Sequence, residues 1–250
     1  MKFSPYSHSK LDVYRQCPYR FKLKYIDKVV IPKTENLALY RGSYIHERIE
    51  NYYNEITFET NEIFTDKHKA ICDDIITDFQ ESDLGKFYYN RDNEVHEKEF
   101  GFKLVDGKLT SCSYDDKDAW LRGKIDYLFI EDNILYIVDW KSGDSKVDSE
   151  YFTDDQMITY VIWAFLTYPN IDTVYTSFVY VEHLNERKNM YKREDFTKYV
   201  KRLYTDTKHC ETDTKLDKDT GPLCEWCDYK KNKHCDGEVD MSIISTGLQF

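Results

Sequence analysis

The segment ILYIVDWKSGDS at residues 134–145 places an acid and a lysine at the end of an apolar stretch. The apolar stretch predicts a buried strand, and residues i and i+2 of a strand point to the same side. Asp139 and Lys141 therefore share one face, about 6–7 Å apart along the strand. The pair is either a structural ion pair at the end of a strand or half of an active site.

A second acid, Asp126, precedes this strand in the motif Gly-Lys-Ile-Asp. Residues 118–131 and 134–141 flank an Asp-Asn turn, which predicts a hairpin that brings Asp126 close to Asp139. Neighbouring carboxylates repel each other unless a cation lies between them, and Mg²⁺ binds one or two carboxylates while it keeps several waters. Lys141 beside such an ion would activate an attacking water and stabilise developing phosphate charge. The alternative is a solvated Asp126 and an ion-paired Asp139.

Three further side chains are candidates for the same site. His46 lies in a predicted helix (GSYIHE) and is a candidate ligand, although a single helical histidine is commonly structural. Gln156 and Tyr160 are four residues apart and share one face of a predicted helix. From that face they would reach toward a nucleic-acid strand or Lys141. Taken alone, they are ordinary residues of an amphipathic helix.

The cysteines form a second group of candidate ligands. Cys224, Cys227 and Cys235 follow the pattern C-x2-C-x7-C, and a tetrahedral site takes four ligands. Spacing alone favours Cys210 as the fourth, and the other candidates are Cys17, Cys72 and Cys112. The stretch MKFSPYSHSK has no apolar signal core, and no apolar run approaches the ~20 residues of a membrane helix. We therefore expect a cytoplasmic protein, in which clustered cysteines indicate metal rather than disulfides.

The elements that must position these residues follow from periodicity and turn signals. Ser9, with Asp12 three residues later, predicts the cap of a first helix. The expected helices are 10–17, a new turn from Pro18 through 21–26, 36–56, 66–80, 151–168 and 193–204. The expected strands are 94–105, 118–131, 134–140 and 173–183, and the three late cysteines lie in a loop. This order predicts a mixed α/β core with a helical N-terminal part.

The motifs occur in the order CPYRF, G-x3-H, GKID, IVDWKSG, Q-x3-Y and C-x2-C-x7-C. This order resembles the PD-(D/E)XK nuclease superfamily over residues 7–236. It is most similar to the branch that holds the RecB and AddB nuclease domains and the iron–sulfur nucleases of CRISPR adaptation. The resemblance implies an α/β restriction-endonuclease-like core, a mixed sheet flanked by helices, with a helical N-terminal part and a C-terminal iron–sulfur loop. We expect one nuclease domain over 1–250, divided into a helical N-terminal region (1–90), a catalytic core (91–205), a cysteine-rich segment (206–237) and a tail (238–250).

The resemblance also implies a role for each candidate in the catalytic core. The implied metal ligands, for Mg²⁺ or Mn²⁺, are His46, Asp126, Asp139 and the backbone carbonyl of Trp140, and Lys141 is the implied catalytic lysine. Gln156 and Tyr160 match the Q-x3-Y motif, and Glu99 is the implied auxiliary acid for a second metal or for substrate. Ile125 stands where the superfamily's name has a proline, as it does in many members of this branch.

For the cysteines, the resemblance implies a 4Fe-4S cluster held by Cys17, Cys224, Cys227 and Cys235. A Zn²⁺ ion held by the same four thiolates is the alternative. Cross-linking distant parts of a chain removes entropy from the unfolded state, which by analogy with a long-loop disulfide stabilises by about 4–5 kcal/mol. We therefore expect a structural staple rather than redox chemistry.

The distribution of charge along the chain indicates which kind of partner the protein binds. The net charge is −11 and the pI about 5.2, which argues against a general nucleic-acid binder. Residues 10–28, however, carry six Lys or Arg against two Asp, and residues 224–235 carry three Lys against two acids. We expect these segments to form a basic aromatic patch for single-stranded DNA, or the aromatics to pack around the cluster instead. The patch aromatics are Tyr14, Tyr19, Tyr25, Trp226 and Tyr229, and the expected DNA contacts are Arg15, Arg20, Lys22 and Tyr160.

Together these observations predict a metal-dependent deoxyribonuclease that acts as an exonuclease on DNA ends, in recombination, repair or DNA processing. One alternative is a structure-dependent endonuclease. Another is a nuclease-like subunit that holds or trims DNA for a helicase, a recombinase or an integration complex. No membrane partner is expected, and the expected location is the cytoplasm of a bacterium or of a phage-infected host.

Overall fold

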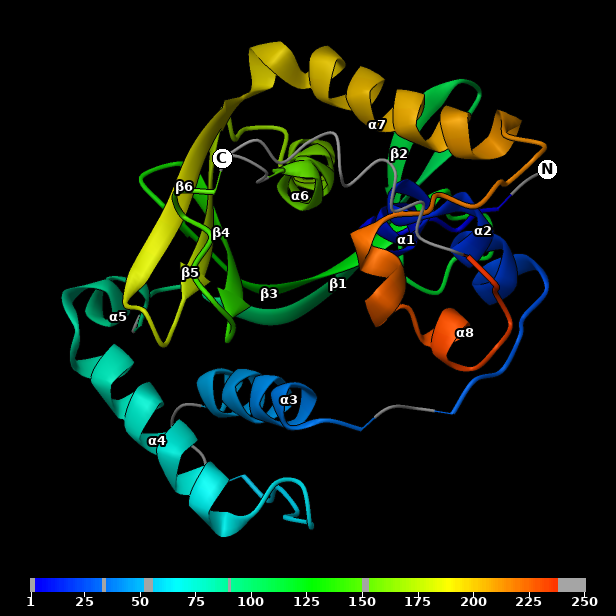
Figure 1. Cartoon of the computed structure of the whole chain (residues 1–250). Coiled ribbons are helices and arrows are strands. Elements are labelled where there is room, and N and C mark those ends of the chain that lie inside the picture. Colours follow the sequence, from blue (N-terminus) through cyan, green and yellow to red (C-terminus); the bar gives the residue numbers. More distant parts are fainter. Residues whose placement is uncertain (1–2, 33–34, 52–55, 90, 150–152, 238–250) are drawn as a thin grey trace, which may run out of the picture. The chain divides into compact units, whose positions relative to one another are not determined.

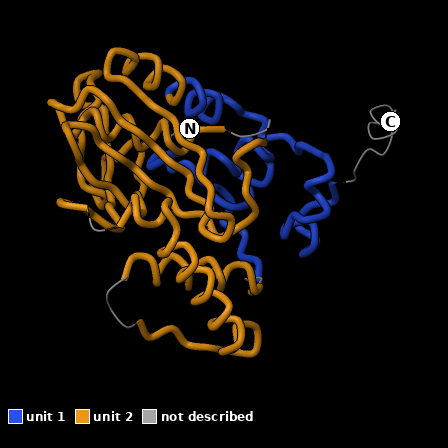
Figure 2. The backbone as a smooth tube through the Cα atoms, turned by 90° about the vertical axis from the view of Figure 1, so that its left-hand side faces the viewer, with its two compact units in different colours: residues 1–34, 204–250 blue, residues 35–203 orange. Residues whose placement is uncertain are grey.

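The computed structural model describes residues 3–32, 35–51, 56–89, 91–149 and 153–237. The chain divides into two compact units, which Figure 2 shows in different colours. The first unit combines residues 1–34 with residues 204–250, and the second spans residues 35–203. The two ends of the chain therefore belong to one unit, and the residues between them form the other.

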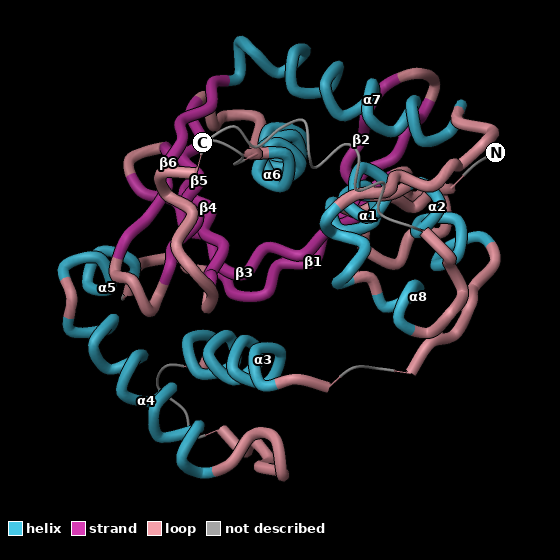
Figure 3. Tube along the Cα trace, in the orientation of Figure 1, coloured by secondary structure: helices cyan, strands magenta, loops and turns pink. Residues whose placement is uncertain are grey.

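A six-stranded mixed sheet forms the centre of the second unit (Figure 3). Its strand order is β2-β1-β3-β4-β5-β6, in which only β4 and β5 run parallel. The strands are β1 (Val95–Val105), β2 (Lys108–Cys112), β3 (Leu121–Glu131), β4 (Ile134–Lys141), β5 (Thr173–Tyr180) and β6 (Asn185–Lys192). The predicted hairpin is present, since β3 and β4 pair through register partners such as Tyr127 and Val138.

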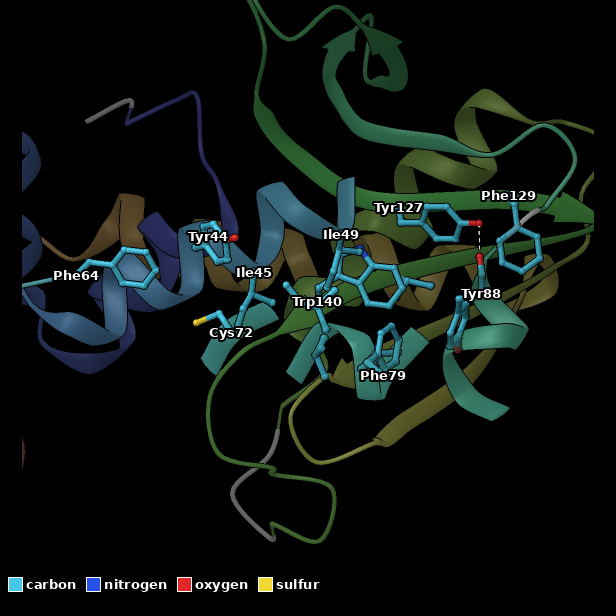
Figure 4. Close-up of a cluster of buried hydrophobic side chains, with 14 residues drawn as sticks. Tyr44, Ile45, Ile49, Phe64, Cys72, Phe79, Tyr88, Tyr127, Phe129 and Trp140 are labelled. Carbon is cyan, nitrogen blue, oxygen red and sulfur yellow. Dashed lines mark hydrogen bonds between the residues drawn. The ribbon is translucent and has the colours of Figure 1, made fainter. Parts of the chain in front are cut away.

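Helices pack against the sheet in Figure 1. Helices α3 (Leu37–Glu50), α4 (Asp66–Glu81) and α5 (Asp83–Tyr88) contribute to one buried cluster with β3 and β4, which Figure 4 shows. Trp140 lies in this cluster, where its ring meets Phe79 and Tyr88 edge-on. Because neighbouring side chains of a strand point to opposite faces, Asp139 and Lys141 face away from this cluster. Helix α6 (Asp155–Thr167), which connects β4 to β5, contacts them there.

The first unit joins both ends of the chain. Helix α1 (His8–Gln16), α2 (Pro18–Phe21) and the π-helix η1 (Lys22–Ile26) pack around the ring of Phe21. The C-terminal segment contains most of α7 (Phe196–Thr212), the 3-10 helix η3 (Pro222–Trp226) and α8 (Asp228–Lys231). A backbone hydrogen bond from Tyr19 to the carbonyl of Asp217, 3.1 Å long, links the two segments.

Several boundaries differ from the sequence prediction. Helix α1 is capped by Ser7 rather than Ser9, because the Ser7 hydroxyl accepts the Lys10 N–H at 3.1 Å. The helix predicted over 36–56 ends at Glu50, where the Asn51 side chain bonds the Glu47 carbonyl. Its positions 52–55, and 150–152 before α6, lie outside the described residues, as does the tail 238–250.

The sequence prediction also missed several short helices and strands. Strand β6 has the hydrophilic sequence NERKNMYK and only five residues make up β2, so neither has the apolar alternation that predicts a strand. Helix α5 and the 3-10 helix η2 (Arg193–Asp195) are short, and the predicted cysteine loop contains two short helical segments, η3 and α8. Within the described ranges, no helix is both long and apolar enough to cross a membrane.

Candidate active site

The carboxylate of Asp139 is the centre of a hydrogen-bonded group in the second unit. Only 4% of this side chain is exposed. Its Oδ2 atom lies 2.5 Å from the ammonium of Lys141. Its Oδ1 atom accepts the Gln156 amide at 2.5 Å and lies 3.2 Å from the Tyr160 hydroxyl. The acid and lysine of strand β4 are therefore paired with each other and with α6.

Asp126 lies where β3 and β4 separate. The last register pair between these strands is Tyr127 with Val138, and residues 139–141 pair with β5 alone. The Trp140 N–H, which has lost its partner on β3, donates to Asp126 Oδ2 at 2.9 Å. The Asp126 carboxylate thus takes the place that a backbone carbonyl of β3 would occupy in a continuous ladder. Strands β3 and β4 are therefore separated at the level of Asp126 and Asp139.

His46 approaches the same carboxylate from helix α3. Its Nδ1 atom lies 3.5 Å from Asp126 Oδ2, and its ring also hydrogen-bonds the backbone of Trp140. Gly42, one turn earlier, makes this approach possible. A Cβ atom at position 42 would lie 3.2 Å from the Ser142 hydroxyl oxygen, tighter than most van der Waals contacts. In the G-x3-H motif, Gly42 therefore provides close packing against Ser142, and His46 provides the side chain that approaches Asp126.

Burial and charge shift the pKa values of both groups. Burial and the nearby Asp139 raise the pKa of Asp126 to about 7, against opposing effects of the Trp140 N–H and of Lys141 and Lys124. Burial lowers the pKa of His46, although Asp139 raises it. The uncharged imidazole is thus favoured near neutral pH, and it is the form that binds a metal ion.

Gln156 and Tyr160 connect α6 to both strands. The Gln156 amide donates to the Tyr160 hydroxyl at 2.7 Å, and the Lys141 ammonium lies 3.5 Å from Gln156 Oε1. The Tyr160 hydroxyl donates to the carbonyl of Lys124 on β3 at 2.8 Å. Burial, and then Asp139, raise the pKa of Tyr160 well above its ordinary value, so the phenol keeps its proton. The Q-x3-Y spacing lets one helix face hold Asp139, Lys141 and β3 together.

Glu99, the expected auxiliary acid, is exposed on β1 and pairs in register with Lys124. A different acid lies closer to the site. The register pairs His96 with Tyr127 and Lys98 with Ile125, which places Glu97 opposite Asp126. Glu97 forms an ion pair with Lys124 and has a positive φ of 52°, an uncommon backbone conformation for a glutamate in a strand. Glu97 and Glu99 both lie on the predicted strand 94–105, two residues apart and therefore on the same expected face, so no sequence signal separates them.

The side chains at this site fit a hard divalent cation. One imidazole and two carboxylates converge, and burial together with the neighbouring Asp139 raises the pKa of Asp126. A divalent cation between the two carboxylates would offset their repulsion. Among the described residues, no three His, Cys, Asp or Glu side chains form a ready-made metal-ion site. Instead, Asp139 bonds Lys141 and Gln156. A bound cation would therefore compete with Lys141 for Asp139.

In the first unit, Cys17, Cys224, Cys227 and Cys235 line one pocket. The Sγ atoms of three of them accept backbone N–H groups, at 3.4 Å from Arg20, 3.5 Å from Gly221 and 3.4 Å from Gly237. Arg20, Lys218 and Lys230 also line this pocket. Four cysteines at one pocket supply the number of sulfur ligands that a tetrahedral metal ion or an iron–sulfur cluster takes.

The fourth cysteine at the pocket is Cys17, although spacing alone favoured Cys210. Cys210 is fully buried in α7 and does not line the pocket. Burial raises the pKa of its thiol to about 12, which disfavours the thiolate that a metal needs. Cys72 and Cys112 belong to the second unit.

The expected DNA contacts in the first unit are engaged within the protein. Arg15 pairs with Asp206 at 2.6 Å and Lys22 with Asp27 at 2.9 Å. The Arg20 guanidinium donates to Gln16 at 2.9 Å. Tyr229 of the expected aromatic patch is buried, whereas Trp226 is exposed.

Comparison with known proteins agrees with this geometry. The family model described as "PD-(D/E)XK nuclease superfamily" matches residues 5–232. The chain belongs to the PD-(D/E)XK nuclease superfamily. Members of this superfamily generally use divalent metal ions, as the side chains around Asp126 and Asp139 would allow.

Solved structures add evidence for the fold of this superfamily member. The structure named "Putative exonuclease" from Eubacterium rectale aligns with a TM-score of 0.55 and 12% identity, over 97% of this chain and 93% of that chain. This likeness supports the shared fold alone. The structure named SSO0001 is 17% identical over 88% of this chain and 95% of that chain, with a TM-score of 0.35 that is too low to support a conclusion. No curated protein matches the chain.

Proposed function

We propose that this superfamily member is a Mg²⁺- or Mn²⁺-dependent deoxyribonuclease that works as an exonuclease on DNA ends. One observation carries the proposal: His46, Asp126, Asp139 and Lys141 converge where β3 and β4 separate. The neutral imidazole, the two carboxylates and the Trp140 carbonyl are the proposed metal ligands. A bound divalent ion would polarise the scissile phosphate and lower the pKa of a water molecule.

The other residues of the site have distinct proposed roles. Lys141, once released from Asp139, would hold the attacking water and stabilise charge on the phosphate. Gln156 contacts both Asp139 and Lys141, so its amide would fix the distance between them. Tyr160 would keep β3 against α6 through the Lys124 carbonyl. The contact between Gln156 and Lys141 supports the expectation that this helix face reaches toward the lysine.

We further propose that the four cysteines of the first unit hold a 4Fe-4S cluster, with zinc as the alternative. The common pocket and the N–H groups that face three sulfurs support this proposal. The cluster would connect the N-terminal segment to the C-terminal one, which makes it structural. Brown purified protein with near-stoichiometric iron and sulfide would agree with the cluster. Colourless protein with one zinc per chain would contradict it.

Incubation with two labelled DNA forms tests the catalytic proposal. End-labelled linear DNA and closed circular DNA are each mixed with the protein and Mg²⁺ or Mn²⁺. Digestion of linear DNA alone supports the exonuclease, and nicked circles would indicate an endonuclease. Absence of digestion would favour a subunit that holds DNA for a partner such as a helicase or an integration complex.

The variant Lys141→Ala separates catalysis from folding. We expect cleavage to fall by at least about a hundredfold, the range associated with loss of one group that stabilises transition-state charge. DNA binding and the metal content of the cysteine site should stay at the level of the parent protein. Cleavage at the parent rate by this variant would contradict the assignment of Lys141.

A further inference from the structure

The 3-10 helix η3 presents two large apolar side chains to solvent beside the cysteine pocket. Leu223 is 67% exposed and Trp226 is 78% exposed. In a 3-10 helix, residues i and i+3 lie on the same face. Leu223 and Trp226 therefore share one face. Cys224 and Cys227 line the pocket together with Leu223, whereas Trp226 does not line it. The turn that holds two cysteines thus also fixes the position of an exposed indole ring.

Trp226 differs from the other three tryptophans of the chain. Trp120, Trp140 and Trp163 are all buried, with at most 8% exposed. A large exposed aromatic side chain is unfavourable in water, and tryptophan is enriched where a ligand or partner covers it. Trp226 is held on a short turn between two cysteines, so little conformational entropy would be lost when a flat ligand stacks on the ring.

The charges around Trp226 indicate the kind of ligand. The Lys231 ammonium lies 5.6 Å from the centre of the Trp226 ring. Lys230 pairs with Glu225 at 2.5 Å, and Lys218 pairs with Asp236. In the described part of the chain, no ion pair involves Lys231 or Lys233, and both lysines are exposed. Because Lys231 lies over one face of the indole, the opposite face of the ring and the nearby ammonium groups together complement a nucleobase and its phosphates.

We propose that Trp226 stacks on an unpaired base of single-stranded DNA while Lys231 contacts the adjacent phosphate. The inference rests on the proposed function, since it assigns a binding contact to the DNA substrate. Bases of an intact duplex are already stacked on each other, so this contact favours single strands over blunt duplex ends. Arg15 and Lys22 already form salt bridges within the protein, whereas Lys231, although near enough to Glu225 to contribute to lowering its pKa, forms no salt bridge among the described residues.

Fluorescence anisotropy of labelled DNA tests the proposal, with the full-length protein in EDTA so that the DNA stays intact. Trp226→Ala should weaken binding of an oligothymidylate roughly 5- to 150-fold, the range for loss of one base–aromatic stack. Trp226→Phe should keep most of the affinity, because it keeps a ring. Met190→Ala, which truncates another exposed apolar residue, on β6, is the matched control and should change nothing.

Salt dependence tests the lysine separately. Lys231→Ala should lower the slope of log affinity against log salt by about 0.7, the value for one single-strand phosphate contact. Lys67→Ala, which removes an exposed lysine on α4 in the second unit, is the control and should leave the slope unchanged.

Two results would overturn the inference: an unchanged oligothymidylate affinity for Trp226→Ala, or an equal loss on blunt duplex. An unchanged affinity is also the result expected if a protein partner, rather than DNA, covers Trp226. Failure of the proposed function is a different result, since the parent protein would then bind DNA and leave it uncut with Mg²⁺ or Mn²⁺.

Discussion

At the residue scale, the protonation of Asp126 determines how the site behaves without metal. Its pKa of about 7 lies above the ordinary value of 3.8 because the buried carboxyl adjoins Asp139. The folded protein therefore binds a proton that the unfolded chain releases between about pH 4 and 7. Stability contributed by this group is complete below pH 4 and is lost as the pH rises toward 7.

Replacement of Asp126 by asparagine, its neutral isostere, should remove this loss of stability at higher pH. Without metal, Asp126→Asn should unfold at a higher temperature than the parent protein at pH 8, and at a similar temperature near pH 4. One pKa unit corresponds to about 1.4 kcal/mol, and 1 kcal/mol shifts Tm by roughly 2–4 °C in a chain of this size. We expect a rise of at least about 2 °C at pH 8 in a thermal melt with EDTA. A lower Tm at pH 8 would show that the ionised carboxylate stabilises the fold.

The positions of Glu97 and Glu99 give a second test at this scale. Glu97 lies opposite Asp126, and Glu99 pairs with Lys124 on the exposed part of β1. We expect Glu97→Gln to reduce cleavage by at least about tenfold, because a nearby carboxylate helps to hold metal or orient substrate. Glu99→Gln should keep activity within about twofold and serves as the matched control. The reverse order of effects would support Glu99 as the auxiliary acid.

At the scale of elements, the site depends on how closely α3 approaches the end of β4. Gly42 allows this approach, since a Cβ atom there would meet the Ser142 hydroxyl at 3.2 Å. Helix α3 carries His46 and must lie near Asp126 for both to bind one ion. The same strand end is held from the other side by Gln156 of α6.

A double-mutant cycle tests this packing. Gly42→Ala should weaken Mn²⁺ binding by about 5- to 150-fold, because overpacking that costs about 1–3 kcal/mol would have to be relieved before His46 could reach a metal beside Asp126. Ser142→Ala removes the oxygen that the new methyl group meets, so the double variant should recover most of the affinity. Calorimetric titration with Mn²⁺ measures all four proteins. Additive losses in the double variant would mean that residues 42 and 142 act independently.

At the scale of the whole molecule, the chain brings its two ends into one unit. Residues 1–34 and 204–250 form this unit, and the four cysteines of the pocket come from both segments. The backbone hydrogen bond between Tyr19 and Asp217 and the ion pair between Arg15 and Asp206 link the two segments. The proposed metal cluster, bound by both segments, would in addition constrain the unfolded chain, as a disulfide over a long loop does.

Loss of one ligand should therefore destabilise this unit. Cys17→Ser should lose most of the bound iron or zinc and lower stability by about 4 kcal/mol, by analogy with a long-loop disulfide. Cys112→Ser, in the second unit, should keep both metal content and stability. Metal analysis and denaturant unfolding of both variants provide the measurement. Full metal content in Cys17→Ser would exclude Cys17 as a ligand.

The sequence by itself determined that Asp126, Asp139 and Lys141 lie close together, because their spacing follows from strand and hairpin geometry. It also determined the mixed α/β class, since apolar strands and amphipathic helices alternate along the chain. Spacing alone favoured Cys210, whereas Cys17 lines the pocket, because sequence distance does not report which thiol reaches a shared pocket. Only the tertiary structure decided this, as it decided that Asp126 replaces a ladder carbonyl and that Trp226 is exposed while Tyr229 is buried. Each of these depends on contacts between segments far apart in the chain, which local patterns do not encode.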